Sequence, residues 1–290
     1  MQMKKRDMST NRQPFPRWST SPELKILSWN IYMLPYISLF NKNDQRAKAI
    51  AERLNGSEYH LIVFQEAFSS KCRNLMSSIL LASFPFQYGP ANDARFSFRT
   101  NSGLWIVSKF PLYQLDHLQF SASKGYDKVA RKGAVLFEGL FNGSKFQLLA
   151  THLQAKDAQK LRALQCTEIK EKLLNPYFED NTPQFLCGDF NIDMHETSAY
   201  HEMLQILDAK NGNLSGSMMV TFDEQENNLA FKANGKRKIL DYALVRNDGL
   251  IEKIERNVQT FLSRIGEVES YLSDHYAMEL HVNFSETRTL

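Results

Sequence analysis

Short apolar segments, each long enough for one β-strand, alternate with helical patterns along most of this 290-residue chain. No apolar run approaches the ~18 residues that a membrane-spanning helix requires. The predicted strands are Leu24–Trp29, Leu61–Phe64, Leu104–Val107, Ala134–Phe141, Phe146–Ala150, Gln184–Cys187, Leu240–Val245 and Tyr276–Val282. This alternation predicts an α/β domain whose sheets pack against each other with helices on the outside.

Amphipathic helices are predicted between several of these strands. They are Asp44–Leu54, Lys71–Leu81, Asp157–Leu174 and Ser198–Leu207. Asp157 is suited to begin the longest of them, and Asn175-Pro176 ends it. Asn142-Gly143 predicts a tight hairpin between two strands. Because no internal repeat or linker-like segment interrupts the pattern, residues 23–290 are predicted to form one domain behind a mobile leader, residues 1–22.

The composition is that of a globular protein, with 43% hydrophobic and 23% charged residues. The net charge of +3 is too small to predict a nucleic-acid partner. The three cysteines, Cys72, Cys166 and Cys187, form no CxxC pair and indicate buried thiols rather than a disulfide framework. The polar segment Met1–Ser21 lacks the apolar stretch of a signal peptide. A cytoplasmic location is therefore the default expectation, with secretion by another route left open.

Polar side chains of the kinds that do chemistry stand at or just beyond the ends of the predicted strands. They are Asn30, Glu66, His152, Asp189, Asn191, Asp241, Asp274 and His275. Open α/β proteins bind their ligands at this rim of the sheet. Taken singly, each residue has an ordinary structural interpretation, such as a turn, a helix cap, a surface ion pair or a satisfied histidine. Together they predict a pocket rich in oxygen ligands that also holds two imidazoles.

The residue types of this pocket favour a hard divalent cation. Carboxylate and amide oxygens suit Mg²⁺ or Mn²⁺, whereas Zn²⁺ favours cysteine and clustered histidine. Because Mg²⁺ is usually held by one or two carboxylates and a substrate phosphate, the pocket indicates phosphoester chemistry. The chain has no GxSxG, no HExxH and no glycine-rich nucleotide loop. Cys187, which lies among apolar residues, is predicted to be a core thiol rather than a nucleophile.

Short motifs around these strand ends resemble those of a known family. They are Ser28-Trp29-Asn30, Phe64-Gln65-Glu66, Gly188-Asp189-Phe190-Asn191, Leu240-Asp241-Tyr242 and Ser273-Asp274-His275, in this order. With them the chain resembles the endonuclease/exonuclease/phosphatase superfamily, whose members have the deoxyribonuclease-I-like fold. The resemblance covers residues 24–282. It implies an α/β (α+β) four-layer sandwich, in which two packed mixed β-sheets are flanked by helices.

Longer segments make the chain most similar to the neutral sphingomyelinase branch of that superfamily. They are Asn30–Pro35, Phe64–Phe68, Arg131–Gly139, Ala150–Asp157, Thr221–Ala230 and Ser273–Leu280. The resemblance implies a phosphodiesterase, dependent on Mg²⁺ with Mn²⁺ as the alternative, that hydrolyses sphingomyelin or a related choline phospholipid to ceramide and phosphocholine. The implied partners are the phospholipid and, transiently, a membrane surface. No stable nucleic-acid partner is expected, and the protein is expected to be a monomer.

The resemblance also implies which residues hold the metal ion and move the proton. Glu66, with help from Asn30, would hold Mg²⁺ against a phosphate oxygen, and Asp274 would lie beside the metal ion. His275 would be the general base that takes a proton from the attacking water. Asp241 would receive the other ring N–H and so orient His275.

The remaining residues of the predicted site would contact the nucleophile and the phosphate. Asp189 and Asn191 would position the nucleophile or a second metal ion. His152 would donate a hydrogen bond to the phosphoryl oxygens in the transition state. Lys132 would contact the phosphate or the leaving group, and a solvated basic turn is the alternative interpretation of this lysine.

The segment before the Ser273-Asp274-His275 motif departs from the secreted members of this branch, which carry an aromatic hairpin there for docking on membranes. The segment Asn257–Leu272 is short for a membrane-docking hairpin and offers only three large apolar or aromatic side chains, Phe261, Leu262 and Tyr271. A choline head group favours an aromatic wall, for which Tyr32–Phe40 and Phe84–Phe98 are the candidates, with core packing as the alternative. Three other functions stay open, namely a metal-dependent nuclease, an inositol-phosphate phosphatase and a binding module that has lost the chemistry.

Overall fold

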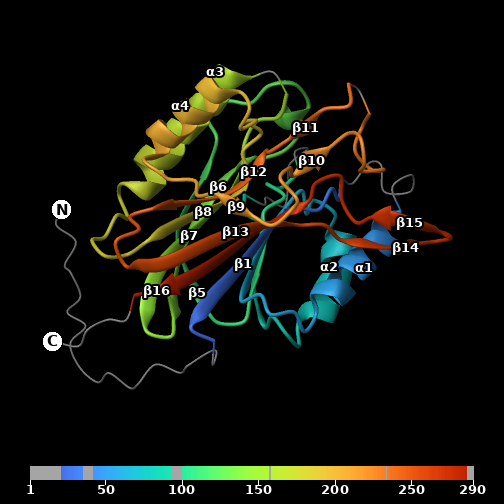
Figure 1. The fold of residues 1–290 in the computed structure, drawn as a ribbon, viewed down its shortest axis with the longest axis horizontal. Coiled ribbons are helices and arrows are strands. Elements are labelled where there is room, and N and C mark those ends of the chain that lie inside the picture. The colour runs from blue at the N-terminus through green and yellow to red at the C-terminus, as the bar shows by residue number, and fades with distance from the viewer. Residues whose placement is uncertain (1–20, 35–41, 93–99, 157, 233, 286–290) are drawn as a thin grey trace.

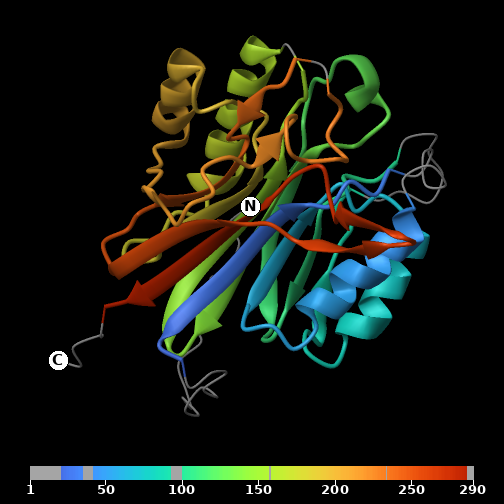
Figure 2. The same ribbon diagram turned by 45° about the vertical axis from the view of Figure 1, so that its right-hand side comes forward.

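The computed structural model describes residues 21–34, 42–92, 100–156, 158–232 and 234–285. Two β-sheets pack face to face, and a pair of helices covers the outer face of each (Figure 1, Figure 2). The predicted four-layer α/β sandwich of two packed sheets is confirmed. Of the predicted leader, residues 1–20 lie outside the described part of the chain.

The larger sheet has seven strands, and its central strand leads to the candidate site. Alternate residues of this central strand face opposite sides of the sheet, so Leu24 and Ile26 enter the core between the sheets while Leu27 and Trp29 face the helices. The strand is parallel to one neighbour and antiparallel to the other. In order, the strands are β3 (Phe86–Tyr88), β4 (Trp105–Ser108), β2 (Leu61–Gln65), β1 (Glu23–Asn30), β16 (Ala277–Phe284), β13 (Ile251–Gln259) and β9 (Leu214–Ser215).

The smaller sheet has five strands, of which two central ones are parallel. In order, they are β12 (Asp241–Arg246), β8 (Gln184–Asp189), β7 (Ser144–His152), β6 (Gly133–Phe141) and β5 (Leu112–Gln119). The turn between β6 and β7 is the predicted hairpin, because Asn142 and Gly143 both have positive φ, 49° and 92°. Cys187 on β8 is buried between the two sheets, as predicted for a core thiol.

The helices lie on the two outer faces. Helices α1 (Asn43–Leu54) and α2 (Ser70–Leu80) pack on the larger sheet. Helices α3 (Gln159–Ile169) and α4 (Thr197–Leu207) pack on the smaller sheet, and a π-helical turn, η3 (Lys170–Leu174), extends α3. The helix predicted from Asp157 thus begins at Gln159, and Asp157 itself lies outside the described residues.

Two small hairpins and one turn complete the fold around the rim. The hairpins are β10 (Phe222–Asp223) with β11 (Arg237–Lys238), and β14 (Leu262–Ile265) with β15 (Val268–Tyr271). The turn is the 3₁₀ segment η2 (Gly125–Lys128). In the part of the chain that the structure describes, no helix has both the length and the apolar character needed to cross a membrane.

His60 directly precedes β2 and is buried. We expect its burial to make the free energy of unfolding depend on pH. Its Nδ1 accepts a hydrogen bond of 3.1 Å from the backbone N–H of Lys25, and its ring lies edge-on to Phe141. Burial, together with the charges of Lys109 and Lys25, lowers the pKa of His60 to about 4. As the pH falls, His60 therefore binds a proton near pH 6.5 in the unfolded chain but only near pH 4 in the folded chain. The resulting stabilisation is present above pH 6.5 and is lost as the pH falls from 6.5 towards 4.

We expect His60 to account for a loss of about 2 kcal/mol in the free energy of unfolding between pH 7 and pH 5. Urea unfolding of the wild-type protein and of His60→Gln at both pH values measures this contribution. The substituted protein should lose less stability over this interval. His201→Gln, which changes an exposed histidine on α4, is the matched control and should behave like the wild type. Equal pH dependence in His60→Gln and the wild type would contradict the prediction.

Candidate active site

The predicted site residues meet at one rim of the sandwich. Asn30 ends β1, while His152 and Asp189 end the parallel strands β7 and β8, where they are paired in register. Asp241 begins β12 directly opposite Asp189. His275 precedes β16 and forms a β-bridge to Phe222 of β10. Because parallel strands end at the same edge, residues from distant parts of the sequence converge there.

Asp189, Asp241 and His275 form a buried cluster at the centre of this rim. His275 Nδ1 lies 2.8 Å from Asp241 Oδ2, and His275 Nε2 lies 3.8 Å from Asp189 Oδ2. The backbone N–H groups of Leu240 and Asp241 donate to Thr221 Oγ1, which fixes the start of β12. The pair of His275 and Asp241 therefore has the geometry predicted for a base and the carboxylate that orients it.

Burial opposes protonation of His275, but the negative charges of Asp241 and Asp189 outweigh it and raise the pKa of His275 well above its usual value. In the protein without a cation, these carboxylates therefore favour the protonated imidazole of His275. A general base needs the neutral ring, so the carboxylate charges around His275 have to be offset before it can accept a proton.

Lys132 and His152 form a second buried pair beside Asp189. Lys132 Nζ lies 3.0 Å from His152 Nε2 and 3.1 Å from Asp127 Oδ1, and it donates to the carbonyl of Leu153 at 2.9 Å. His152 Nε2 lies 3.5 Å from Asp189 Oδ2. Only 5% of Lys132 is exposed, so the interpretation of this lysine as part of a solvated turn is wrong. Burial and the charge of Lys132 lower the pKa of His152 well below its usual value, which keeps its imidazole neutral.

The two asparagines hold the carboxylate of Asp189 in place. Asn30 Nδ2 donates to Asp189 Oδ2 at 3.1 Å, while Asn30 Oδ1 accepts from the backbone N–H of Tyr32. The backbone N–H of Asn191 donates to Asp189 Oδ1 at 2.9 Å, and Asn191 Nδ2 donates to the carbonyl of Leu153. Asp189 therefore accepts hydrogen bonds from Asn30 and Asn191 and lies beside both His152 and His275.

Glu66 and Asp274 add two further acidic groups with raised pKa values. Burial and the negative charge of Asp274 raise the pKa of Glu66 to about 7. Burial likewise raises the pKa of Asp274, and burial with the charge of Asp241 raises the pKa of Asp189 to about 6. Several carboxyl groups thus share one region of low dielectric, where their mutual repulsion disfavours the charged form.

This acidic group fits a divalent cation. Glu66 Oε2 and Asp241 Oδ1 are buried and have no hydrogen-bond partner within the described residues. Ligand atoms of Asp189, Asp241 and His275 all lie within 4.8 Å of one another. A divalent cation would partner the orphaned oxygens and relieve the repulsion between the carboxylates. The donor set, mostly oxygen, suits Mg²⁺ or Mn²⁺.

Arg46 on α1 is a residue of this region that the sequence analysis misses. Its guanidinium donates to the carbonyls of Ile31 at 3.0 Å and Leu272 at 2.8 Å, and also to the carbonyl of Tyr32. It thereby ties the segment after Asn30 to the segment before the Ser273-Asp274-His275 motif. A sequence signal exists, because Arg46 lies on the otherwise mostly apolar face of α1 that packs on the sheet.

We expect Arg46→Met to lower the free energy of unfolding by ~3 kcal/mol, because it removes a buried charge and leaves several buried carbonyls without donors. Arg53→Met makes the same change at an exposed position of α1 and should cost less than ~1 kcal/mol. Urea unfolding at pH 7 measures both. Equal stability losses in the two variants would contradict this role for Arg46.

Comparison with known proteins gives one family match. The profile of the Endonuclease/Exonuclease/phosphatase family matches residues 27–275. Sphingomyelinase C 2 of Leptospira interrogans serogroup Icterohaemorrhagiae serovar Lai (strain 56601) is 26% identical, and the alignment covers 93% of this chain and 47% of that relative. The chain therefore spans about half the length of this relative.

Solved structures show the same fold. The sphingomyelinase C structure from Streptomyces griseocarneus matches with a TM-score of 0.77 at 22% identity and covers 91% of this chain and all of that one. A beta toxin variant from Staphylococcus aureus, crystallised with bound magnesium ions, matches with a TM-score of 0.76 at 23% identity and the same coverage. At these identities the likeness shows the fold, and it confirms the predicted deoxyribonuclease-I-like architecture.

Proposed function

Because the chain belongs to the endonuclease/exonuclease/phosphatase family, we propose that it is a metal-dependent phosphodiesterase that hydrolyses sphingomyelin or a related choline phospholipid. The products are phosphocholine and ceramide, or diacylglycerol where the substrate is phosphatidylcholine. The buried cluster of Asp189, Asp241 and His275 carries this proposal, because it places a base, its orienting carboxylate and an oxygen-rich cation site within one rim. The sphingomyelinase C relative supports the choice of substrate.

Glu66 and Asp189 are the carboxylates proposed to hold the cation, with Asn30 and Asp274 beside them. When bound, Mg²⁺ supplies positive charge that offsets the negative charge developing on the phosphoryl group. With positive charge in this site, the carboxylates of Asp189 and Asp241 would favour the protonated form of His275 less, so its neutral imidazole could accept a proton. His275 Nε2 then accepts a proton from the attacking water, while Nδ1–H donates to Asp241 Oδ2.

Lys132 and His152 are proposed to bind the phosphoryl oxygens. Both are buried, and their nitrogens lie 3.0 Å apart beside Asp189. Lys132 is held by Asp127 and by the carbonyl of Leu153, so its ammonium group is oriented before substrate binds. Preorganised donors of this kind stabilise a transition state without the cost of reorganising solvent.

Exposed apolar side chains near the site favour a lipid over a nucleic acid. Tyr126 lies next to Asp127, and it is 84% exposed. Phe231, 83% exposed, follows the segment of Asn227, whose side chain donates to the carbonyl of Ser273. The hairpin of β14 and β15 exposes Leu262 and Val268. Exposed large apolar side chains on the segments around the site would offer contacts to a lipid.

The two aromatic segments predicted for a choline wall are only partly described. Residues 35–41 and 93–99 lie outside the described part of the chain. Phe84 is fully buried against the face of the larger sheet that α1 and α2 cover, which agrees with core packing for the start of its segment. The choline-binding ring therefore stays a prediction.

We expect Mg²⁺-dependent release of phosphocholine, with sphingomyelin preferred over phosphatidylcholine, detergent-dispersed lipid preferred over intact bilayers, and duplex DNA untouched. Phosphocholine release and plasmid nicking are measured in one preparation, with inositol phosphates as a third substrate class, in Mg²⁺ and in EDTA. Glu66→Gln assigns each activity to this site. Nicking that disappears in Glu66→Gln, without phosphocholine release from any lipid, would establish a nuclease instead.

A further inference from the structure

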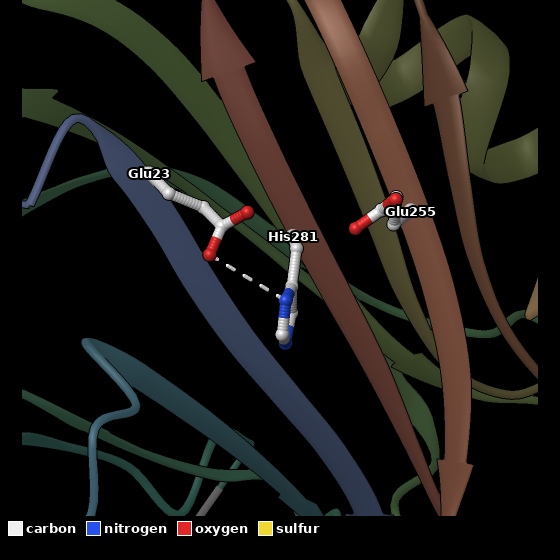
Figure 3. Close-up of side chains that lie close together, drawn as sticks. All are labelled: Glu23, Glu255 and His281. Carbon is white, nitrogen blue, oxygen red and sulfur yellow. Dashed lines mark ion pairs between the residues drawn. The ribbon is translucent and has the colours of Figure 1, made fainter. Parts of the chain in front are cut away.

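A second group of metal-ligating side chains lies on the outer face of the larger sheet, far from the active site. Glu23 of β1, His281 of β16 and Glu255 of β13 come from three neighbouring strands and point toward one another (Figure 3). Glu255 lies directly opposite His281 in the strand register, and Glu23 lies diagonally across from it, opposite Asn283. One ligand atom from each of the three residues lies within 4.8 Å of the other two.

The ligand atoms of this group are incompletely used within the protein. Lys25 Nζ and His281 Nδ1 each lie 3.6 Å from the carboxylate of Glu23, beyond hydrogen-bonding distance. Lys25 instead donates to Glu58 at 2.5 Å. His281 Nε2 is buried and has no hydrogen-bond partner in the described part of the chain. The carboxylate of Glu23 thus makes only long ion-pair contacts within the protein, and His281 Nε2 is a buried nitrogen without a hydrogen bond.

The carboxylate of Glu279 lies on the Nε2 side of His281 and is held in place by two hydrogen bonds. Glu279 Oε2 lies 3.8 Å from His281 Nε2 and accepts a hydrogen bond from Gln259 at 3.0 Å, while Glu279 Oε1 accepts from Tyr59. In metal sites, the histidine nitrogen that does not bind the metal usually donates to such a carboxylate, which sets the tautomer. Nδ1 of His281 lies on the side of Glu23 and is the nitrogen placed to bind a metal ion, whereas Nε2 faces Glu279 at 3.8 Å, a distance longer than a hydrogen bond.

We propose that Glu23, Glu255 and His281 bind Zn²⁺ at a second metal site, distinct from the cation site at the active centre. Because His281 would itself bind the ion, one imidazole nitrogen and two carboxylate oxygens, with water at the open position, suit Zn²⁺, whereas the active-site ligands proposed for Mg²⁺ are oxygen atoms alone and His275 there is the base. Two lysines compete for the same oxygens. Lys253 Nζ lies 2.8 Å from Glu255 but is 60% exposed and free to swing into solvent, and Lys25 keeps its bond to Glu58.

The site would act on the stability of the sheet rather than on catalysis. Glu23 begins β1, whereas Asn30, seven residues further, reaches the active site, so the two sites lie ~23 Å apart along the strand. A Zn²⁺ ion bound here would cross-link β1 and β13 through β16. Because the ion binds the folded chain and not the separated strands, it should raise the unfolding temperature.

The test is an anomalous diffraction measurement at the zinc edge on crystals soaked with ZnCl₂ in excess MgCl₂, which occupies the active site. We expect a peak between Glu23, Glu255 and His281. Calorimetric titration with ZnCl₂ in the same excess of MgCl₂ should show one site in the wild type, and an affinity at least ~10-fold weaker in His281→Gln and in Glu255→Gln. Glu252→Gln, the same change at an exposed position of β13, should bind like the wild type.

Three results would overturn the proposal. The first is a peak at Asp189, Asp241 and His275 alone, the second is no peak at all, and the third is zinc affinity unchanged in His281→Gln. Unfolding temperatures measured without zinc show whether each variant folds. In a folded His281→Gln protein, the stabilisation by ZnCl₂ should be lost while Mg²⁺-dependent turnover is retained.

Discussion

Replacing His275 with alanine is expected to lower kcat by ~10²–10⁴ while KM changes little, because the substitution removes the proposed base but no group that binds the lipid. His275 is buried, and its Nδ1 lies 2.8 Å from Asp241 Oδ2, which holds the ring in place. Steady-state kinetics on detergent-dispersed sphingomyelin over a range of pH measures the effect. The acid limb of the pH–rate profile, which reports deprotonation of the base, should disappear in the variant.

Asp241→Asn provides the graded comparison. An amide cannot stabilise the imidazolium, and it loses the charge that raises the pKa of His275. We therefore expect a smaller loss of kcat than in His275→Ala, with the acid limb moved to lower pH. An unaltered pH–rate profile in His275→Ala would show that another group is the base. Circular dichroism and urea unfolding establish that both proteins are folded.

Glu66→Gln is expected to raise the Mg²⁺ concentration required for half-maximal activity and to lower kcat by ~10² or more. Glutamine keeps the size of the side chain but removes a negative charge from the group of buried carboxyls. Burial and Asp274 already raise the pKa of Glu66 to about 7, so the charged form is disfavoured without a cation. Titration of activity with MgCl₂ measures both changes.

The same variant should leave the protein without metal no less stable. Removing Glu66 relieves repulsion with Asp274 and Asp189, so the free energy of unfolding in EDTA should stay equal to that of the wild type or rise. Stabilisation of the wild type by MgCl₂ should shrink in Glu66→Gln. Near-native rates at low Mg²⁺ would place the metal ion on other residues.

Much of the architecture could be predicted because apolar runs and strands coincide. The predicted strand Leu24–Trp29 is β1, extended by one residue at each end. The turn at Asn142-Gly143 could be predicted because both residues tolerate positive φ. Strand β13 was not predicted, since its outward residues are charged and one inward position is the buried Arg256. An arginine within the buried series of a strand hides the alternation on which the prediction depends.

The residues of the candidate site could be predicted from the sequence, but the surroundings of each side chain could not. The sequence left two interpretations of Lys132, and only packing against His152, Asp127 and the carbonyl of Leu153 shows that it is buried. Arg46 was missed for the converse reason, because its acceptors are backbone carbonyls of two distant segments. Because every residue has a backbone carbonyl, the residue types of a sequence do not show which carbonyls a side chain will contact.

Which side chains lie at the rim can be predicted from local sequence, because the apolar pattern of a strand and the polar residue that ends it are local properties. Which of these side chains meet depends on how the distant strands are packed. His275 pairs with Asp241 across 34 residues of sequence, and Asn30 pairs with Asp189 across 159. Such partners depend on which strands lie side by side and on how the two sheets face each other. The same packing removes water from the carboxylates, and this desolvation raises the pKa values of Glu66 and Asp189 and makes the rim suited to a cation.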